Sequence, residues 1–101
     1  MNLANQRIVY LNGEFVPESE ARIPIKDQGF KFGDAVFDTT RTFGHEIFKL
    51  REHLERFERS MRYLKLDGGH SLDDFVSVTE EVVRRYLPLI ASDDEYWVTQ
   101  R

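Results

Sequence analysis

Two arginines are the residues of this sequence best suited to bind a ligand. Arg41 lies in a stretch rich in β-branched and aromatic residues, and Arg56 lies in a stretch with helical periodicity. The planar guanidinium group offers paired donors that match the oxygens of a phosphate or a carboxylate. Each arginine is therefore a candidate for holding an anion.

The histidines and glycines do not form a familiar catalytic or metal-binding pattern. His45, His53 and His70 lack the four-residue helical spacing and the acidic companions that metal sites use. The segment Gly29–Gly33 is not followed by a helix that opens with Lys-Ser or Lys-Thr, as a phosphate-binding loop requires. The sequence favours no metal site and predicts no catalytic residue within this chain.

Residues 36–43 predict a strand with polar side chains on both faces. Because side chains two apart share a face, the strand divides into a first face of Phe37, Thr39, Arg41 and Phe43 and a second face of Val36, Asp38, Thr40 and Thr42. Such a mixture is typical of a strand that lines a cleft or an interface. The alternative is a half-exposed sheet on which Arg41 and Asp38 meet charged neighbours.

Residues 50–66 predict the clearest helix. Its apolar stripe recurs at spacings of three and four residues and consists of Leu50, Leu54, Phe57, Met61 and Leu64. A polar ribbon along one flank of the stripe consists of His53, Arg56, Ser60 and Tyr63. Residues at the edge of a buried face can look into a cleft. The alternative is that Arg56 pairs with Glu52, four residues earlier, and His53 packs at the boundary.

The segments before residue 36 predict strands joined by tight turns. Residues 7–16 read as a hairpin, because Asn12-Gly13 is the dipeptide favoured in a type I′ turn. Residues 21–25 could pair again, although Pro24 confines them to an edge or a short extension. A bend punctuated by glycines at residues 29–33 then leads into the central strand.

The second half of the chain predicts two further strands and a second helix. Residues 46–49 and 95–101 have strand composition. Ser71, with Asp74 three residues later, resembles a capping box for a helix that Pro88 must end. The whole chain is thus expected to form a mostly antiparallel sheet with two helices.

Composition restricts the classes of protein to consider. With 101 residues the chain can form one small domain. Hydrophobic residues make up 41% and charged residues 32%, which excludes wholesale disorder, and a net charge of −4 provides no basic surplus for nucleic acid. There is no cysteine, no signal peptide pattern and no apolar run long enough to span a membrane. We expect a cytoplasmic protein.

Three segments together resemble the N-terminal domain of the class IV aminotransferases, the fold type IV enzymes that use pyridoxal phosphate. These segments are residues 9–16 (Val-Tyr-Leu-Asn-Gly-Glu-Phe-Val), residues 27–38 (Asp-Gln-Gly-Phe-Lys-Phe-Gly-Asp-Ala-Val-Phe-Asp), and residues 47–60 with Glu-His-Leu-Glu-Arg-Phe at 52–57. The family includes branched-chain and D-amino-acid aminotransferases, R-selective amine transaminases and aminodeoxychorismate lyase. The resemblance covers nearly the whole chain, in order.

The resemblance implies an α+β fold, a two-layer small domain with a mostly antiparallel sheet packed on two helices. Residues 1–101 would be the N-terminal domain of a homodimeric enzyme. A larger C-terminal domain would carry the lysine that forms the Schiff base with pyridoxal 5′-phosphate. Arg56 stands at the position of the arginine that binds the cofactor phosphate. The substrate-pocket positions correspond to Phe32, Phe37, Thr39 and Arg41.

The resemblance implies amino transfer between an amino acid or amine and a 2-oxo acid, with this chain inactive by itself. Phe32 stands where branched-chain enzymes often have tyrosine, Asp38 where glutamate is more usual, and Val98 near an arginine of the branched-chain enzymes. The sequence Phe-Gly-Asp at 32–34 is shared with the D-amino-acid branch. Aminodeoxychorismate lyase chemistry is one alternative. A non-catalytic binding or dimerisation domain, which would use exposed aromatic residues such as Trp97, is another.

Overall fold

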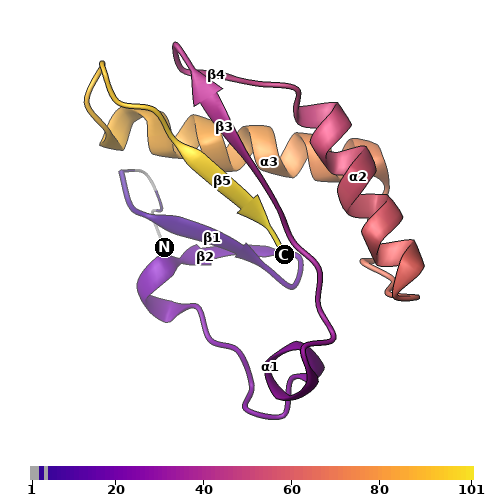
Figure 1. Ribbon diagram of the computed structural model, residues 1–101. Helices are drawn as coiled ribbons and strands as arrows, with labels where there is room; N and C mark the ends of the chain where they lie inside the picture. The colour runs from indigo at the N-terminus through magenta and orange to yellow at the C-terminus, as the bar shows by residue number, and fades with distance from the viewer. Residues whose placement is uncertain (1–2, 4) are drawn as a thin grey trace.

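The computed structural model describes residue 3 and residues 5–101. Figure 1 shows two small antiparallel sheets and two long helices. In chain order the elements are β1 (Ile8–Leu11), β2 (Glu14–Pro17), the 3-10 helix η1 (Glu18–Glu20), α1 (Gln28–Phe32), β3 (Asp38–Phe43), β4 (Glu46–Ile47), α2 (Leu50–Tyr63), α3 (Leu72–Tyr86), the 3-10 helix η2 (Leu87–Leu89) and β5 (Trp97–Gln100).

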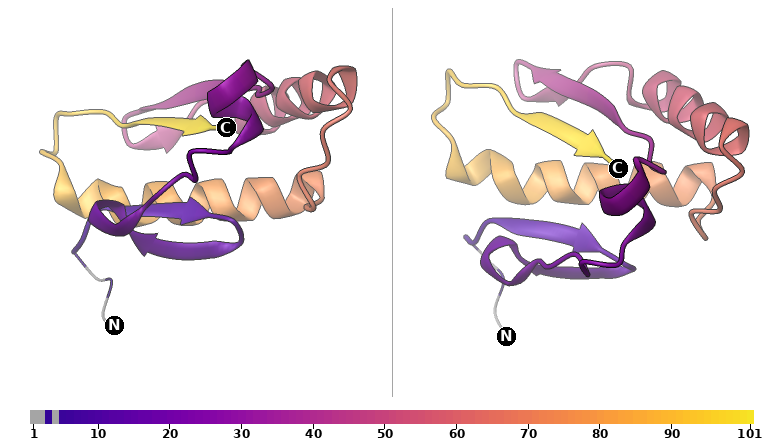
Figure 2. Two further views of the ribbon diagram at one scale, coloured as in Figure 1. Left: turned by 90° about the horizontal axis from the view of Figure 1, so that it is seen from below. Right: turned by 60° about the horizontal axis from the view of Figure 1, so that its bottom comes forward.

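The strands are divided between a β1–β2 hairpin and a three-stranded sheet in the order β4-β3-β5. All three strand pairs are antiparallel. Helix α2 packs against β3 and α3, while α3 contacts both β1 and β5. Figure 2 shows α3 running between the β1–β2 hairpin and the sheet that contains β5, so this helix joins the two sheets. The predicted α+β class with antiparallel strands on two helices is confirmed, although the strands form two sheets.

Local signals in the sequence predicted several elements correctly. Asn12 (φ 52°) and Gly13 (φ 88°) both adopt positive φ, as a type I′ turn requires. Helix α3 begins with the predicted capping box, in which the Ser71 hydroxyl accepts from the Asp74 amide and the Asp74 carboxylate accepts from the Ser71 amide. The α-helix ends before Pro88, also as predicted.

The core follows the predicted apolar stripe of α2 up to its last turn. Leu50, Leu54, Phe57 and Met61 form one buried cluster. Leu64 was expected to continue it, but α2 ends at Tyr63 and Leu64 is 39% exposed. Beyond the helix, Lys65 adopts a positive φ of 59°, and this left-handed residue turns the chain away from the helix axis before the stripe is complete.

Two expectations for the segment before β3 are wrong. Residues 21–25 form no strand, because η1 turns the chain away after β2 and Pro24 has no amide hydrogen to donate to a ladder. The glycine-punctuated segment 29–33 forms the short helix α1, not a simple bend. The Asp27 side chain caps that helix at the amide of Phe30, and Gly33 ends it with a φ of 69°.

Candidate functional site

Strand β3 separates two sets of side chains, as its alternating pattern predicted. Asp38, Thr40 and Thr42 are buried, with exposed fractions of 4%, 3% and 1%. Thr39 and Arg41 are half-buried, and Phe43 is exposed. The buried face of this central strand is therefore polar, so each of its side chains needs a hydrogen-bonding partner.

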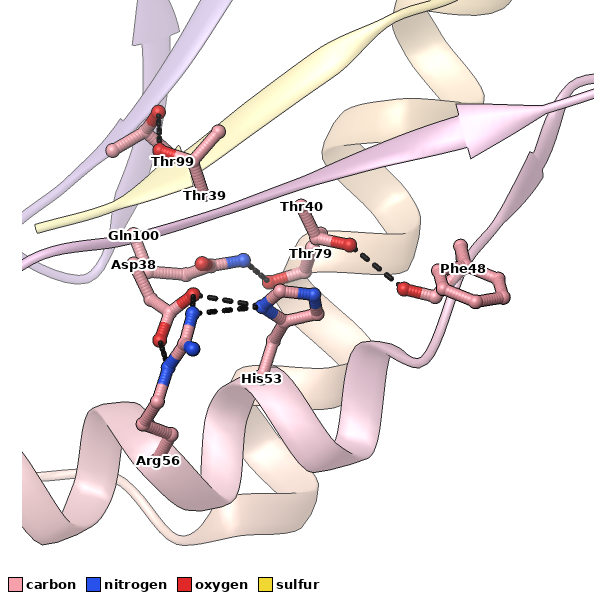
Figure 3. A network of polar contacts seen from close by, with 9 residues as sticks. All are labelled: Asp38, Thr39, Thr40, Phe48, His53, Arg56, Thr79, Thr99 and Gln100. Atoms are coloured by element: carbon pink, nitrogen blue, oxygen red, sulfur yellow. Dashed lines mark hydrogen bonds and ion pairs between the residues drawn. The ribbon is translucent and has the colours of Figure 1, made fainter.

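Asp38 finds its partners on α2. Arg56 donates from Nε to Asp38 Oδ2 at 2.7 Å and from Nη2 to Asp38 Oδ1 at 2.8 Å. His53 Nδ1 lies 2.8 Å from the same Oδ1. Figure 3 shows the arginine and the histidine converging on the carboxylate from successive turns of one helix. Three polar residues therefore form a cluster between β3 and α2.

The electrostatics of this cluster favour an ionised carboxylate. The hydrogen bonds from Arg56 are the main cause that lowers the pKa of Asp38, and the contact with His53 also lowers it, while burial opposes both. An ionised carboxylate can only accept, so His53 must carry its hydrogen on Nδ1. Arg56 Nη2 and His53 Nδ1 lie 3.3 Å apart. They are two donors that share one acceptor, Asp38 Oδ1.

The structure contradicts the ion pair between Arg56 and Glu52 that the sequence allowed. Arg56 turns away from its own helix and makes a bidentate ion pair with Asp38 on β3. The Arg56 side chain is nevertheless 61% exposed, whereas the Asp38 side chain is 3% exposed. The outer edge of the guanidinium is thus open to solvent while its inner edge is held.

An open depression of about 420 Å³ lies along α2 beside this cluster. Its lining consists of Val36, Arg56, Arg59, Ser60, Tyr63 and Leu64. Two guanidinium groups and two hydroxyl groups supply donors, and Val36 with Leu64 supplies an apolar wall. Arg59 has no ion-pair partner within the described part of the chain. The depression therefore offers unused positive charge to an anion that carries an apolar group.

The other face of β3 carries a second set of side chains. Thr39 Oγ1 lies 2.9 Å from Thr99 Oγ1 on β5. The Arg41 guanidinium lies 4.0 Å from the centre of the Phe43 ring and 5.6 Å from that of Trp97. These contacts place the Arg41 guanidinium beside two aromatic rings on the outer face of the sheet.

The structure brings only some of the expected site residues together. Phe37, Thr39 and Arg41 follow one another on the outer side of the β3 segment, whereas Arg56 lies on the helix side with Asp38. Phe32 ends α1, where it is 68% exposed and the Lys31 ammonium lies 5.0 Å from its ring. The five residues thus occupy three places on the surface of this domain.

The role of Asp38 was not predicted from the sequence, although a signal for it was present. Asp38 was assigned to the face opposite Phe37, Thr39 and Arg41, and that face turns toward the helices. A carboxylate placed there needs a cation. The only long cationic side chain on the predicted polar ribbon was Arg56, so the pair could have been inferred.

A second carboxylate, Glu95, was also missed. It accepts hydrogen bonds from Thr42 Oγ1 at 2.7 Å and from the amides of Gly44 and His45 at 2.6 and 3.0 Å. These bonds, with the Thr42 hydroxyl first, lower the pKa of Glu95 to about 2. Glu95 thereby joins the segment just before β5 to the turn between β3 and β4.

The described residues contain no group of histidine, cysteine and acidic side chains that could hold a metal ion. Within the same residues, no helix combines the length and the apolar character that crossing a bilayer demands.

Comparison with known proteins places this domain. The sequence profile of a family described as "Amino-transferase class IV" matches residues 35–89. The D-alanine aminotransferase of Staphylococcus haemolyticus is 34% identical over 76 residues, which are 75% of this chain and 27% of that protein. The D-alanine aminotransferase of Staphylococcus epidermidis strain ATCC 12228 is 37% identical over 79 residues, 78% of this chain and 27% of that protein.

The fold agrees with a solved structure. A crystal structure of a branched-chain aminotransferase from Thermoproteus uzoniensis, with norvaline, superposes with a TM-score of 0.80 at 24% identity, over 94% of this chain and 32% of that one. This similarity shows the fold, a small α+β domain. The chain belongs to the class IV aminotransferase family. It spans about a quarter of the length of the curated relatives it matches.

Proposed function

We propose that this chain is the N-terminal domain of a pyridoxal-phosphate-dependent aminotransferase and that Arg56 binds the phosphate of the cofactor. The observation that carries the proposal is the position of Arg56, which has one edge held by a buried carboxylate and the other open to a basic depression. A dianionic phosphate matches the paired donors of such a guanidinium. The family membership supports the same reading.

The residues around Arg56 fit this cofactor in chemical type. Arg59 adds a second cation and Ser60 adds a hydroxyl donor, while Val36 offers apolar contact for the ring of the cofactor. When bound, pyridoxal phosphate acts as an electron sink for the substrate carbon. The residues of this chain bind and orient it. The lysine that would bond to it lies, in this proposal, in a C-terminal domain outside residues 1–101, so this chain by itself is inactive.

We assign the outer face of β3 to the substrate. Phe37, Thr39 and Arg41, together with Phe32 from α1, would line the pocket once a C-terminal domain and a second subunit cover them. Arg41, held against Phe43, presents a guanidinium suited to a substrate carboxylate. The substrates are an amino acid, of the branched-chain or D type, or an amine, and a 2-oxo acid. Names of relatives support this assignment.

The experiment compares Arg56→Ala with the natural full-length protein. Both apoproteins are titrated with pyridoxal phosphate and with pyridoxal, which lacks the phosphate. We expect the variant to lose about 1.5 to 3 kcal/mol of pyridoxal phosphate affinity, the range for a hydrogen bond to a charged group, and to keep its pyridoxal affinity. Arg62→Ala is the matched control, because Arg62 lies on the same helix and, among the described residues, its ion-pair partner is the carboxylate of Glu58 at 2.6 Å.

Two outcomes would contradict the proposal. Unchanged pyridoxal phosphate affinity in Arg56→Ala would mean that Arg56 has only a structural role, in its ion pair with Asp38. Release of pyruvate from aminodeoxychorismate, with no transfer to any 2-oxo acid, would assign the full-length protein to lyase chemistry, which uses the same cofactor.

A further inference from the structure

We propose that Asp38 is a positioning residue that orients the Arg56 guanidinium for phosphate. The inference rests on the function proposed above. Asp38 itself stays out of contact with the ligand, because its side chain is only 3% exposed and lies behind the arginine. Its effect on the cofactor passes entirely through Arg56.

The geometry of the pair carries the argument. Asp38 accepts from Nε and from Nη2 of Arg56, which are two donors at one end of the planar group. A bidentate contact of this kind fixes both the position and the plane of the guanidinium. Among the described residues Nη1 has no acceptor, and Arg56 is one of the residues that line the depression. Arg56 therefore presents a fixed pair of donors rather than a mobile charge.

The carboxylate is itself held in place. Asp38 sits in β3 opposite Gln100 of β5, and the Gln100 amide donates to Thr79 on α3 at 3.2 Å. His53 makes a third contact with the carboxylate at 2.8 Å. Figure 3 shows this set of contacts joining the strands to both helices. The sheet thus holds a long, exposed arginine side chain in one position. Less conformational entropy of this side chain is then lost when phosphate binds.

A purely electrostatic account makes the opposite prediction. If Asp38 acted only as a negative charge near the site, its removal would strengthen the attraction between Arg56 and a phosphate dianion. If Asp38 orients the guanidinium, its removal weakens phosphate binding even though a repelling charge has gone. The sign of the change therefore separates the two accounts.

The experiment uses the full-length apoprotein and the variants Asp38→Asn and Asp38→Glu. Asparagine has nearly the same shape but replaces one acceptor oxygen by an NH2 donor and cannot form the bidentate pair, whereas glutamate keeps both acceptor oxygens. We expect Asp38→Asn to weaken pyridoxal phosphate binding about tenfold, the order of one ordered side chain, and to leave pyridoxal binding unchanged. We call the preference for pyridoxal phosphate over pyridoxal the phosphate selectivity. Asp38→Glu should keep most of it. Asp73→Asn is the control, because Asp73 pairs with another α2 arginine, Arg51, at 2.7 Å.

A double variant completes the test. If Asp38 acts through Arg56, adding Asp38→Asn to Arg56→Ala should cause no further loss of phosphate selectivity. Tighter or unchanged pyridoxal phosphate binding in Asp38→Asn would overturn the inference. Equal weakening of pyridoxal and pyridoxal phosphate, without rescue by Asp38→Glu, would also overturn it, because that result describes general structural damage.

The failure of this inference differs from the failure of the proposed function. Loss of phosphate selectivity in Arg56→Ala without any loss in Asp38→Asn removes only the role of Asp38. Unchanged phosphate selectivity in Arg56→Ala removes both the role of Asp38 and the proposed role of Arg56 in binding the phosphate. If Asp38→Asn does not fold, Arg56→Lys replaces it: lysine keeps the charge but cannot bind the carboxylate in bidentate fashion. Full phosphate selectivity in Arg56→Lys would then overturn the inference, and a loss of about tenfold would support it.

Discussion

Tyr86→Phe tests the contact that fastens the N-terminal hairpin to α3. The Tyr86 hydroxyl donates to the backbone oxygen of Ile8 at 2.7 Å. Both residues are buried, with exposed fractions of 6% and 2%. In the β1–β2 ladder the neighbouring Arg7 oxygen accepts from the Glu18 amide, so the Ile8 carbonyl, one residue further on, points away from β2. Removal of one hydroxyl therefore leaves a buried carbonyl without its donor.

The size of the effect follows from this environment. A buried acceptor left without a partner costs about 1 to 3 kcal/mol. The phenylalanine ring keeps the shape of the tyrosine and keeps the stacking on Tyr96, whose ring centre lies 4.6 Å away. The loss of packing is thus small, and the hydrogen bond accounts for the change. For a domain of this size about 2 kcal/mol corresponds to a decrease in Tm of about 8 to 16 °C.

Thermal unfolding followed by circular dichroism, at low protein concentration, measures the change. Tyr63→Phe is the control, because Tyr63 is 86% exposed and the same hydroxyl deletion there should shift Tm by less than about 2 °C. A Tyr86→Phe protein that melts within about 2 °C of the unmodified chain would refute the reasoning. The Ile8 carbonyl would then have a second donor that replaces the tyrosine.

Two further predictions concern acid stability and association. The pKa of Glu95 is lowered to about 2 from 4.5, so its contribution to stability is complete above pH 4.5 and is lost as the pH falls toward 2; urea unfolding across this window should show a steeper loss for the natural chain than for Glu95→Gln. Phe37 and Trp97 are 66% and 64% exposed, so the isolated chain should self-associate. In sedimentation the double variant Phe37→Ser/Trp97→Ser should shift toward the monomer, and a natural chain that stays monomeric at high concentration would contradict this.

Local sequence patterns were sufficient for the elements that depend on neighbouring residues. The type I′ turn at Asn12-Gly13 follows from the backbone preferences of two adjacent residues. The buried stripe of α2 and the capping box of Ser71 follow from periodicity and spacing within one helix. Each of these features has its cause within a few residues, so the sequence alone contains the necessary information.

The ends of elements and the weaker segments were harder to predict. The pairing expected for residues 21–25 did not form, because a strand needs a partner edge as well as suitable residues. The stripe of α2 stopped one turn early at a left-handed Lys65. In both places the competing conformations differ little in local energy, and contacts elsewhere decide between them.

The candidate site, too, was predicted only in part from the sequence. Its residue types, an arginine on a helical flank and a strand with polar residues on both faces, were visible in the sequence and predicted anion binding. The partner of Arg56 was not, because Asp38 lies 18 positions earlier in the chain, whereas Glu52 lies one helical turn away. Likewise, Glu95 reaches the β3–β4 turn across 50 positions.

The sequence by itself determined the two long helices, the apolar stripe of α2 and the turn at Asn12-Gly13, since these depend on the chemistry of nearby residues. Only the tertiary structure decided which elements lie side by side, and hence that a buried carboxylate on β3 holds the exposed arginine of α2. The physical reason is that pairing between distant segments depends on burial and hydrogen bonding summed over the whole chain. No local pattern of residues expresses that sum.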